Sequence, residues 1–305
     1  MMGHVLSIAA TSFDAAFGGL PSAPAVAGSR AGTIILDEQN VESALYKQLA
    51  RNEPPGLRKV ARYHDALLVR RFEHRWLRRA SVVTTCSSTD AGYLKAEIAS
   101  TATIAVIPNG VDTSSVEFYD GPRDQHRMIM VGGLSYAPNV DAAAYLVHEV
   151  MPRVWRARPD VVLELIGANP TREVRALQGP RVSVIGTVPD TRPYLRRAAL
   201  EIVPLRSGGG TRLKILEAMA AGTPIVSTTR GAEGLDVQDG VHLRLADTAD
   251  ALTTAILATL ASPRDAAAKA RAARQLVVSA YDWREIGHRF TDLIEASVFN
   301  GAARD

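Results

Sequence analysis

The chain has 305 residues, of which 47% are apolar and 22% are charged, and its net charge is +3. These values exclude a disordered, fibrous or coiled-coil chain, and so small a net charge gives no reason to expect a nucleic-acid partner. No apolar run approaches the roughly 20 residues that span a bilayer. The single cysteine, Cys86, excludes a disulfide framework, and no arginine precedes Arg30, so we expect no secretory signal and a cytoplasmic protein.

The first third of the chain predicts an incomplete α/β domain. Residues 1–33 are mostly Ala, Gly, Ser and Pro, and we expect them to be weakly structured. Downstream, short β-branched runs alternate with helical periodicity. The predicted strands lie at 33–36, 81–85 and 103–107, and the predicted helices lie at 41–52, 57–79 and 90–97. Three strands are few for an open sheet, so residues 34–112 predict only part of a domain.

The rest of the chain predicts a complete domain. Residues 113–127 show no periodicity and predict a linker. Over residues 128–282 strands and helices alternate, and several of these strands end in glycine, which predicts a doubly wound parallel sheet. In such sheets ligands bind at the carboxyl ends of the strands. Asn139 or Asp141 is expected to cap the helix that follows the first of these strands.

A glycine triplet at 208–210 gives the strongest local signal. It runs directly into a helix predicted over 211–221, where free backbone N–H groups and the helix dipole make an anion site. Arg206 and Lys214 flank this start and can neutralise a diphosphate. Glu217 lies three residues after Lys214 on the same face, where a carboxylate can accept hydrogen bonds from the hydroxyls of a ribose. The alternative is an ordinary ion pair between Lys214 and Glu217 on a solvated helix.

Four motifs follow one another in the order 108–112 (PNGVD), 132–134 (GGL), 217–226 (EAMAAGTPIV) and 281–283 (YDW). Together they resemble the motifs of retaining glycosyltransferases of family 4, the group 1 type, which have the GT-B fold. The resemblance implies an α/β chain with two Rossmann-like, doubly wound domains, of which the first is incomplete here. It places an acceptor-side domain at 34–112, a nucleotide-sugar-binding domain at 128–282 and a last helix at 283–305 that returns toward the first domain.

The resemblance also implies roles for individual residues. Glu217 would hold the donor ribose, and Arg206 and Lys214 would be the catalytic cations that neutralise the departing nucleoside diphosphate. The remaining donor-binding positions are implied for the phosphates and glycine loops at Gly132, Gly133, Gly209, Gly210, Thr211, Arg212 and Leu213, and for the base at Gly167, Val188 and Pro189. No metal and no other cofactor is expected, because side-chain cations would stabilise the leaving group.

The chain departs from the family pattern at four places. The lysine that usually follows the glycine strand end is replaced by residues 136–139 (YAPN). The first glutamate of the family's donor-site helix motif aligns with Gly209. Residues 37–43 (DEQNVES) resemble an Asp-Glu-His-Asn-Val-Glu-Ser segment of one bacterial subgroup, with Gln39 in place of histidine. This segment would face the acceptor, which makes Glu38, Gln39, Asn40 and Glu42 the candidates on that side. No strand with a glycine-rich loop is predicted before Thr33, so we expect a first domain that is truncated, degenerate or assigned too late a start.

The function that the resemblance implies is transfer of a sugar, of the hexosyltransferase type, from a nucleoside-diphosphate-sugar to a glycan or a lipid-linked acceptor. Two alternatives stay open. One is a catalytically impaired fragment that only binds a nucleotide-sugar. The other is a nucleotide-sugar 2-epimerase, although its chemistry needs acids and bases that Gly209 and Gln39 do not supply. The arginine-rich helix from Leu57 to Arg79 is compatible with peripheral contact at the inner face of the membrane, or with a solvated basic surface.

Overall fold

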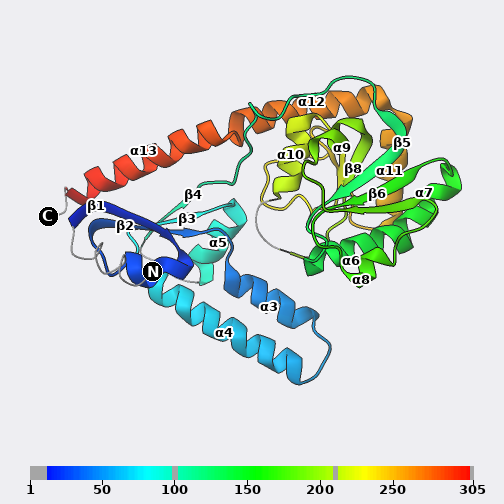
Figure 1. Cartoon of the computed structure of the whole chain (residues 1–305). Coiled ribbons are helices and arrows are strands. Elements are labelled where there is room, and N and C mark those ends of the chain that lie inside the picture. The colour runs from blue at the N-terminus through cyan, green and yellow to red at the C-terminus, as the bar shows by residue number, and fades with distance from the viewer. Residues whose placement is uncertain (1–11, 98–101, 209–211, 303–305) are drawn as a thin grey trace. The chain divides into compact units, whose positions relative to one another are not determined.

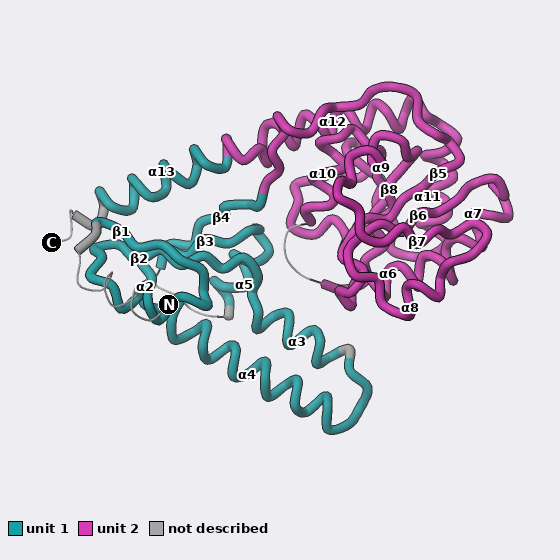
Figure 2. The backbone as a smooth tube through the Cα atoms, viewed as in Figure 1, with its two compact units in different colours: residues 1–109, 209–211, 286–305 teal, residues 110–208, 212–285 magenta. Residues whose placement is uncertain are grey.

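The computed structural model describes residues 12–97, 102–208 and 212–302 (Figure 1). The chain divides into two compact units (Figure 2). Unit 1 comprises residues 1–109, 209–211 and 286–305, and unit 2 comprises residues 110–208 and 212–285. Each unit has a parallel sheet and helices, which confirms the predicted class of two α/β units.

Unit 1 contains a four-stranded parallel sheet in the order β1-β2-β3-β4. Its strands are β1 (Ser12–Gly19), β2 (Arg30–Glu38), β3 (Val82–Thr85) and β4 (Thr103–Val106). All four residues of β3 are buried, as expected for a strand that is covered on both faces. The small core of this unit is built from Leu20, Ala23, Leu36, Val41, Leu77, Ala80, Val83 and Leu94.

The expectation that residues 1–33 are weakly structured is wrong for the part that the structure describes. Residues 12–19 form strand β1, which pairs in parallel with β2 and ends in Gly18-Gly19. A short 3-10 turn (Leu20–Ser22) and helix α2 (Ala23–Val26) follow. Small residues predict a strand poorly, but here they let the backbone pack closely. A Cβ on Gly18 would lie 2.6 Å from Ser22 Oγ.

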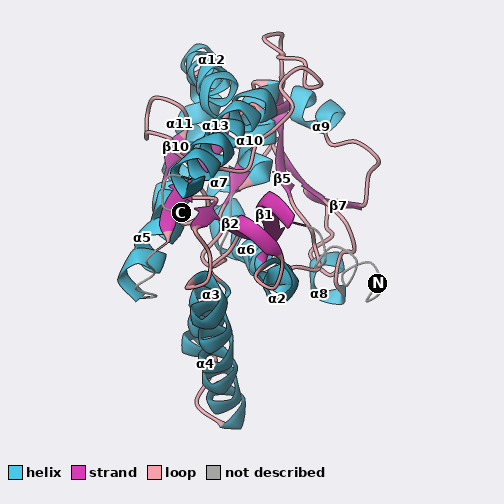
Figure 3. Ribbon diagram, turned by 90° about the vertical axis from the view of Figure 1, so that its left-hand side faces the viewer, coloured by secondary structure: helices cyan, strands magenta, loops and turns pink. Residues whose placement is uncertain are grey.

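A helical hairpin extends from the sheet of unit 1. Helices α3 (Glu42–Asn52) and α4 (Leu57–Leu77) lie side by side in Figure 1, and in the turned view of Figure 3 they extend together in one direction. The buried Glu73 of α4 accepts a hydrogen bond from the backbone N–H of Ser43 at 2.8 Å, which ties the two helices together. Helix α5 (Ser88–Glu97) connects β3 with the segment that leads to β4.

The last helix, α13 (Trp283–Ala302), begins in unit 2, and from Ile286 on it belongs to unit 1. Within unit 1 the ring of Phe290 packs edge-on against Phe17 of β1, with 5.1 Å between the centroids. The backbone oxygen of Ser297 accepts a hydrogen bond from the Thr33 hydroxyl of β2 at 3.5 Å. Helix α13 therefore packs on strands β1 and β2.

Unit 2 contains a six-stranded parallel sheet in the order β10-β9-β8-β5-β6-β7. Its strands are β5 (Asp124–Val131), β6 (Val162–Ile166), β7 (Val182–Gly186), β8 (Ala198–Val203), β9 (Ile225–Ser227) and β10 (Arg244–Leu245). Strand β8 lies near the middle and all six of its residues are buried. This sheet supplies the centre of a much larger core than that of unit 1.

Helices cover the sheet of unit 2 (Figure 1). They are α6 (Ala137–Tyr145), α7 (Met151–Ala157), α8 (Arg172–Arg175), α9 (Arg192–Arg197), α10 (Leu213–Ala221), α11 (Ala249–Ala261) and α12 (Pro263–Ala280), with a π-helical stretch (Leu146–Val150) between α6 and α7. The predicted linker at 113–127 is wrong at its end, because β5 begins at Asp124. Its first part is packed on unit 2, where Val116 joins the core and the Arg274 guanidinium donates to the Thr113 and Val116 carbonyls.

Candidate functional site

Three neighbouring strands of unit 2 end in glycine or are followed by it. At these positions no side chain of the strands occupies the carboxyl edge of the sheet. Gly132 follows β5, Gly167 follows β6 and Gly186 ends β7. They lie in a row, because the Gly132 N–H donates to the Ile166 carbonyl at 2.9 Å and the Gly167 N–H donates to the Gly186 carbonyl at 2.8 Å. Gly167 has a φ of 152°, and a Cβ on it would overlap the Gly132 carbonyl. Only glycine fits there.

Lys214 lies in the first turn of α10 and places its ammonium directly against Gly132. Lys214 Nζ donates a hydrogen bond to Asn139 Oδ1 at 2.8 Å. Asn139 Nδ2 in turn donates to the Gly133 carbonyl at 2.9 Å. Asn139 therefore fixes the cation and the glycine loop relative to each other. The result is one positive charge at the cleared edge of the sheet, beside the start of α6.

The charged groups around Lys214 set its protonation. Burial lowers the pKa of Lys214 to about 8, and the nearby charge of Arg212 acts in the same direction. The carboxyl groups of Glu201 and Glu217 oppose this and favour the ammonium form. Glu201, on β8, is completely buried, and burial raises the pKa of its carboxyl.

Glu217 lies one turn after Lys214 on α10 and is half-buried. Burial is the main cause that raises the pKa of Glu217; the charge of Asp190 adds to it and that of Lys214 opposes it. Its carboxyl oxygens make no hydrogen bond to the residues that the structure describes, so they are available to hydroxyl donors. Because Asp190 acts on Glu217, the loop with Val188 and Pro189 lies close to α10. The half-buried Val188 packs on the core and Pro189 is exposed.

Arg206 points to a different partner from the one predicted. Its guanidinium forms a two-point ion pair with Asp141 of α6, with 3.0 Å between Nε and Oδ2, and it stacks on the Tyr145 ring at 4.5 Å. The side chain is 47% exposed. A diphosphate would have to share Arg206 with Asp141, so its predicted catalytic role stays a prediction.

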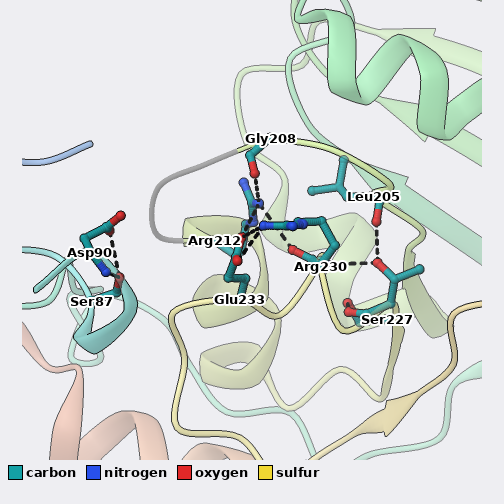
Figure 4. A network of polar contacts seen from close by, with 10 residues as sticks. Ser87, Asp90, Leu205, Gly208, Arg212, Ser227, Arg230 and Glu233 are labelled. Atoms are coloured by element: carbon teal, nitrogen blue, oxygen red, sulfur yellow. Dashed lines mark hydrogen bonds and ion pairs between the residues drawn. The ribbon is translucent and has the colours of Figure 1, made fainter. Parts of the chain in front are cut away.

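The side chain of Arg212 makes hydrogen bonds to backbone carbonyls of unit 2 (Figure 4). It is buried, and Nη2 donates to the Gly208 carbonyl at 2.9 Å and to the Arg230 carbonyl at 3.2 Å. Glu233 Oε2 lies 3.9 Å from the same nitrogen. Only backbone groups of Arg212 and of the exposed Leu213 can serve a ligand as predicted. Gly209, Gly210 and Thr211 lie outside the described residues.

The acceptor-side candidates lie in unit 1, at and after the end of β2. Glu38 is 1% exposed, so its carboxyl lies inside the unit and not at a surface that an acceptor could reach. Burial and the charge of Glu73 raise the pKa of Glu38 to about 9. Gln39 is exposed, and Asn40 and Glu42 are half-buried. For these three residues the acceptor role stays a prediction.

Three residues of the site were missed or misassigned from the sequence. Asn139 and Asp141 were expected as helix caps, but α6 begins at Ala137 after the N-cap Tyr136, with Pro138 in its first turn. Asn139 and Asp141 instead bind the two predicted cations, Lys214 and Arg206. Glu201 could have been noticed, since a single acid inside an apolar strand is unusual.

Comparisons with known proteins find similar glycosyltransferases. Residues 125–262 match the family described as glycosyl transferases group 1. A GDP-mannose-dependent α-(1-6)-phosphatidylinositol monomannoside mannosyltransferase of Mycolicibacterium smegmatis is 29% identical over 239 residues, which cover 70% of this chain and 62% of that protein. A glycogen synthase of Mycobacterium tuberculosis is 32% identical over 204 residues, which cover 61% of this chain and 46% of that protein.

Solved structures show the same fold. Sucrose-phosphate synthase from Thermosynechococcus elongatus matches with a TM-score of 0.71 and 20% identity over 93% of this chain and 73% of that one. HepE from Anabaena, solved with UDP and glucose, matches with a TM-score of 0.71 and 15% identity over 96% of this chain and 80% of that one. The two units thus have the fold of GT-B glycosyltransferases, and residues 125–262 match the group 1 glycosyl transferases in sequence.

Proposed function

We propose that this chain is a glycosyltransferase that moves a sugar from a nucleoside-diphosphate-sugar to a hydroxyl of a glycan or a lipid-linked acceptor. One observation carries the proposal: the Lys214 ammonium sits against Gly132, at a strand end that glycines keep open, with Glu217 one turn further along the same helix. The match of residues 125–262 to the group 1 family supports it. The chain spans 62% and 46% of the two curated relatives, which are a mannosyltransferase and a glycogen synthase.

In this proposal the diphosphate binds against the glycine loop and Lys214, and Glu217 accepts hydrogen bonds from the ribose hydroxyls. The bond between the anomeric carbon and the diphosphate oxygen breaks, and the nucleoside diphosphate leaves as an anion. Cations beside that oxygen stabilise the growing charge, which lowers the barrier. The acceptor oxygen forms the new bond to the anomeric carbon, and its proton goes to an oxygen of the departing diphosphate. Lys214 supplies the positive charge. Arg206 assists when its guanidinium binds the diphosphate as well as Asp141, and no metal is needed.

We further propose that the anomeric configuration is retained, as the resemblance to the retaining group 1 enzymes implies. The bound UDP and glucose of HepE, although only a similarity of fold links it to this chain, make UDP-sugars reasonable first probes. The name of the mycobacterial relative makes GDP-mannose the second. An assay of the product by NMR separates retention from inversion, since it reads the anomeric coupling directly.

The test of the donor site is Glu217→Ala, with binding of UDP, GDP and ADP measured by calorimetry. Losing hydrogen bonds to a charged group costs about 1.5–3 kcal/mol, so we expect the affinity to fall roughly ten- to a hundredfold. Glu173→Ala, an exposed acid on α8, is the control and should change nothing. Unchanged nucleotide affinity in Glu217→Ala would refute the assignment. Binding without sugar transfer would identify a nucleotide-sugar-binding chain instead of an enzyme.

We also propose that α4 rests on an anionic lipid surface, where a lipid-linked acceptor would be found. No helix among the described residues is long and apolar enough to cross a membrane. The solvent side of α4, however, combines large apolar side chains with arginines. Its exposed apolar residues are Leu57, Val60, Tyr63, Leu67, Leu68 and Phe72, and its exposed arginines are Arg58, Arg62, Arg70, Arg71 and Arg75.

Vesicle co-sedimentation tests the lipid contact. The chain should bind vesicles that contain phosphatidylglycerol and bind vesicles of phosphatidylcholine alone more weakly, because the arginines attract anionic headgroups. A double variant, Leu67→Ser with Leu68→Ser, should lose most of this binding while nucleotide affinity stays unchanged. Equal binding of the variant and the wild type would rule out α4 as the contact.

A further inference from the structure

Glu201 is a buried acid that the proposed reaction does not use. It lies in β8, near the middle of the sheet of unit 2, and its exposure is 0%. Neither carboxyl oxygen has a hydrogen-bond partner among the described residues. The Val131 N–H favours its charged form but does not reach hydrogen-bonding geometry. An unpaired buried carboxyl costs several kcal/mol, so its presence in an otherwise apolar strand calls for a physical reason.

A second buried glutamate in the same sheet shows what a purely structural acid looks like. Glu164 of β6 is 4% exposed. Its oxygens are paired with two arginines, and Arg197 Nη2 lies 2.9 Å from Oε2 and 3.1 Å from Oε1. Arg127 forms an ion pair with the same carboxylate. Glu164 is thus satisfied within the fold, whereas Glu201 is not.

The positive charge that acts on the Glu201 carboxyl is that of Lys214. The Lys214 ammonium is the positive neighbour that stabilises the charged form of Glu201, while Glu217 destabilises it. Around Lys214 itself, β8 contributes Glu201, α10 contributes Glu217 and the opposing charge of Arg212, and α6 contributes the uncharged Asn139. Of these charged groups, Glu201 has the largest effect on the pKa of Lys214, and it acts from strand β8.

We propose that Glu201 is a positioning residue: from inside the sheet it keeps the Lys214 ammonium charged and seated against Gly132, where a diphosphate binds. This inference rests on the proposed function, because it gives Lys214 the diphosphate as its ligand. A lysine this enclosed tends to lose its proton, and a buried acid behind it opposes that loss. The pKa of Lys214 therefore stays at about 8 and does not fall further, and Asn139 holds the direction of the ammonium.

The direct test follows Lys214 alone and needs no ligand. The chain contains only five lysines, so a protein labelled with 13C at the lysine Cε positions gives few NMR signals, and Lys214→Arg assigns the one of interest. In Glu201→Gln, the titration midpoint of Lys214 should fall by at least about one pH unit relative to the wild type. Glu201→Asp should restore part of the shift. Glu164→Gln, the matched control, should leave the midpoint unchanged.

The second readout is the pH dependence of UDP, GDP and ADP binding, which a merely structural role would not move. Wild-type affinity should fall on the alkaline side with the Lys214 midpoint, and in Glu201→Gln the fall should begin about one pH unit earlier. An unchanged Lys214 midpoint in a folded Glu201→Gln protein overturns the inference and leaves the donor site intact. A wild type that binds none of the three nucleotides refutes the proposed function, while the NMR titration still reports on the pair.

Discussion

The carboxyl edges of the two parallel sheets are built in opposite ways. In unit 2 the strands β5, β6 and β7 end in glycine, and the side chain that reaches this edge from α10 is the cation Lys214. In unit 1 the edge of β2 and β3 is filled with side chains. The Thr84 hydroxyl donates to Asp37 at 2.7 Å, and Glu38 and Glu73 bury two carboxyls beside each other.

The buried acids sharpen this difference. Glu201 in unit 2 faces a lysine, which favours its charged form, whereas Glu38 in unit 1 faces another carboxyl, which favours its neutral form. The first edge therefore offers open backbone and positive charge, which suits a diphosphate. At the second edge the carboxyl groups of Glu38 and Glu73 and the hydroxyl of Thr84 are buried inside the unit. The open, positively charged edge supports the proposed donor site in unit 2, and the acceptor role of unit 1 stays a prediction.

The largest effect is expected from filling the open edge of unit 2. In Gly167→Ala the new Cβ would overlap the Gly132 carbonyl, and alanine would adopt a φ of 152°. Because backbone must move and the strained conformation itself costs energy, we expect a loss of roughly 3 kcal/mol or more in the free energy of unfolding. Denaturant titration by circular dichroism measures it, and nucleotide affinity should fall in parallel.

The matched control lies in the neighbouring loop, which follows β5. Gly133 has no atom within 4 Å of an added Cβ, so Gly133→Ala should leave the stability nearly unchanged. If both variants were equally stable, the edge would tolerate side chains, and the contrast between the two sheets would lose its physical basis.

An effect of roughly half that size, for each unit of pH, is expected from the titration of Glu38 in unit 1. Burial first, and then the charge of Glu73, raises the pKa of Glu38 from its ordinary 4.5 to about 9. Between these values the folded protein holds a proton that the unfolded chain releases. Stability therefore falls as pH rises from about 4.5 to 9, by up to about 1.4 kcal/mol per pH unit. Below this window both states are protonated and the contribution is fully present.

Glu38→Gln removes that titration. Its melting temperature, followed by circular dichroism from pH 5 to 9, should decline less steeply than that of the wild type. Asp65→Asn, a half-buried acid on α4, serves as the control and should retain the wild-type slope. A Glu38→Gln protein with the full wild-type slope would show that Glu38 is not the proton-holding group of unit 1.

The two units also differ in how far the sequence predicts them. The strands β5 to β8 could be predicted, because each is a β-branched or aliphatic run, and the first three lead directly into glycine. Strand β1 could not, because its alanines and glycines carry little strand preference and its stability comes from pairing with β2. A propensity-based prediction sees the chain alone and not the neighbour that stabilises the strand.

The candidate site shows the same limit at the level of side chains. Lys214 and Glu217 could be placed on one face of a helix, because helical spacing is local. The partners of Asn139 and Asp141 could not be predicted, since both bonds join α6 to segments some 65 to 75 residues away. A capping role was the local interpretation available, and the proline in the first turn moved the helix start ahead of both residues.

The smallest effect is expected from replacing Asp141, the carboxylate that would compete with a diphosphate for Arg206. Asp141 pairs with Arg206, and the two side chains are 41% and 47% exposed, so the pair contributes at most about 1 kcal/mol to stability. In Asp141→Asn the guanidinium is released, and if it then turns to the diphosphate, nucleotide affinity should rise roughly two- to fivefold by calorimetry. Asp120→Asn breaks a pair with Arg271 of similar exposure (50% for each partner) and should cost the same stability without any gain in affinity. Equal nucleotide affinity in both variants would remove Arg206 from the donor site and leave Lys214 as its cation, since among the described residues Arg206 binds Asp141 and Tyr145 and not the glycine edge.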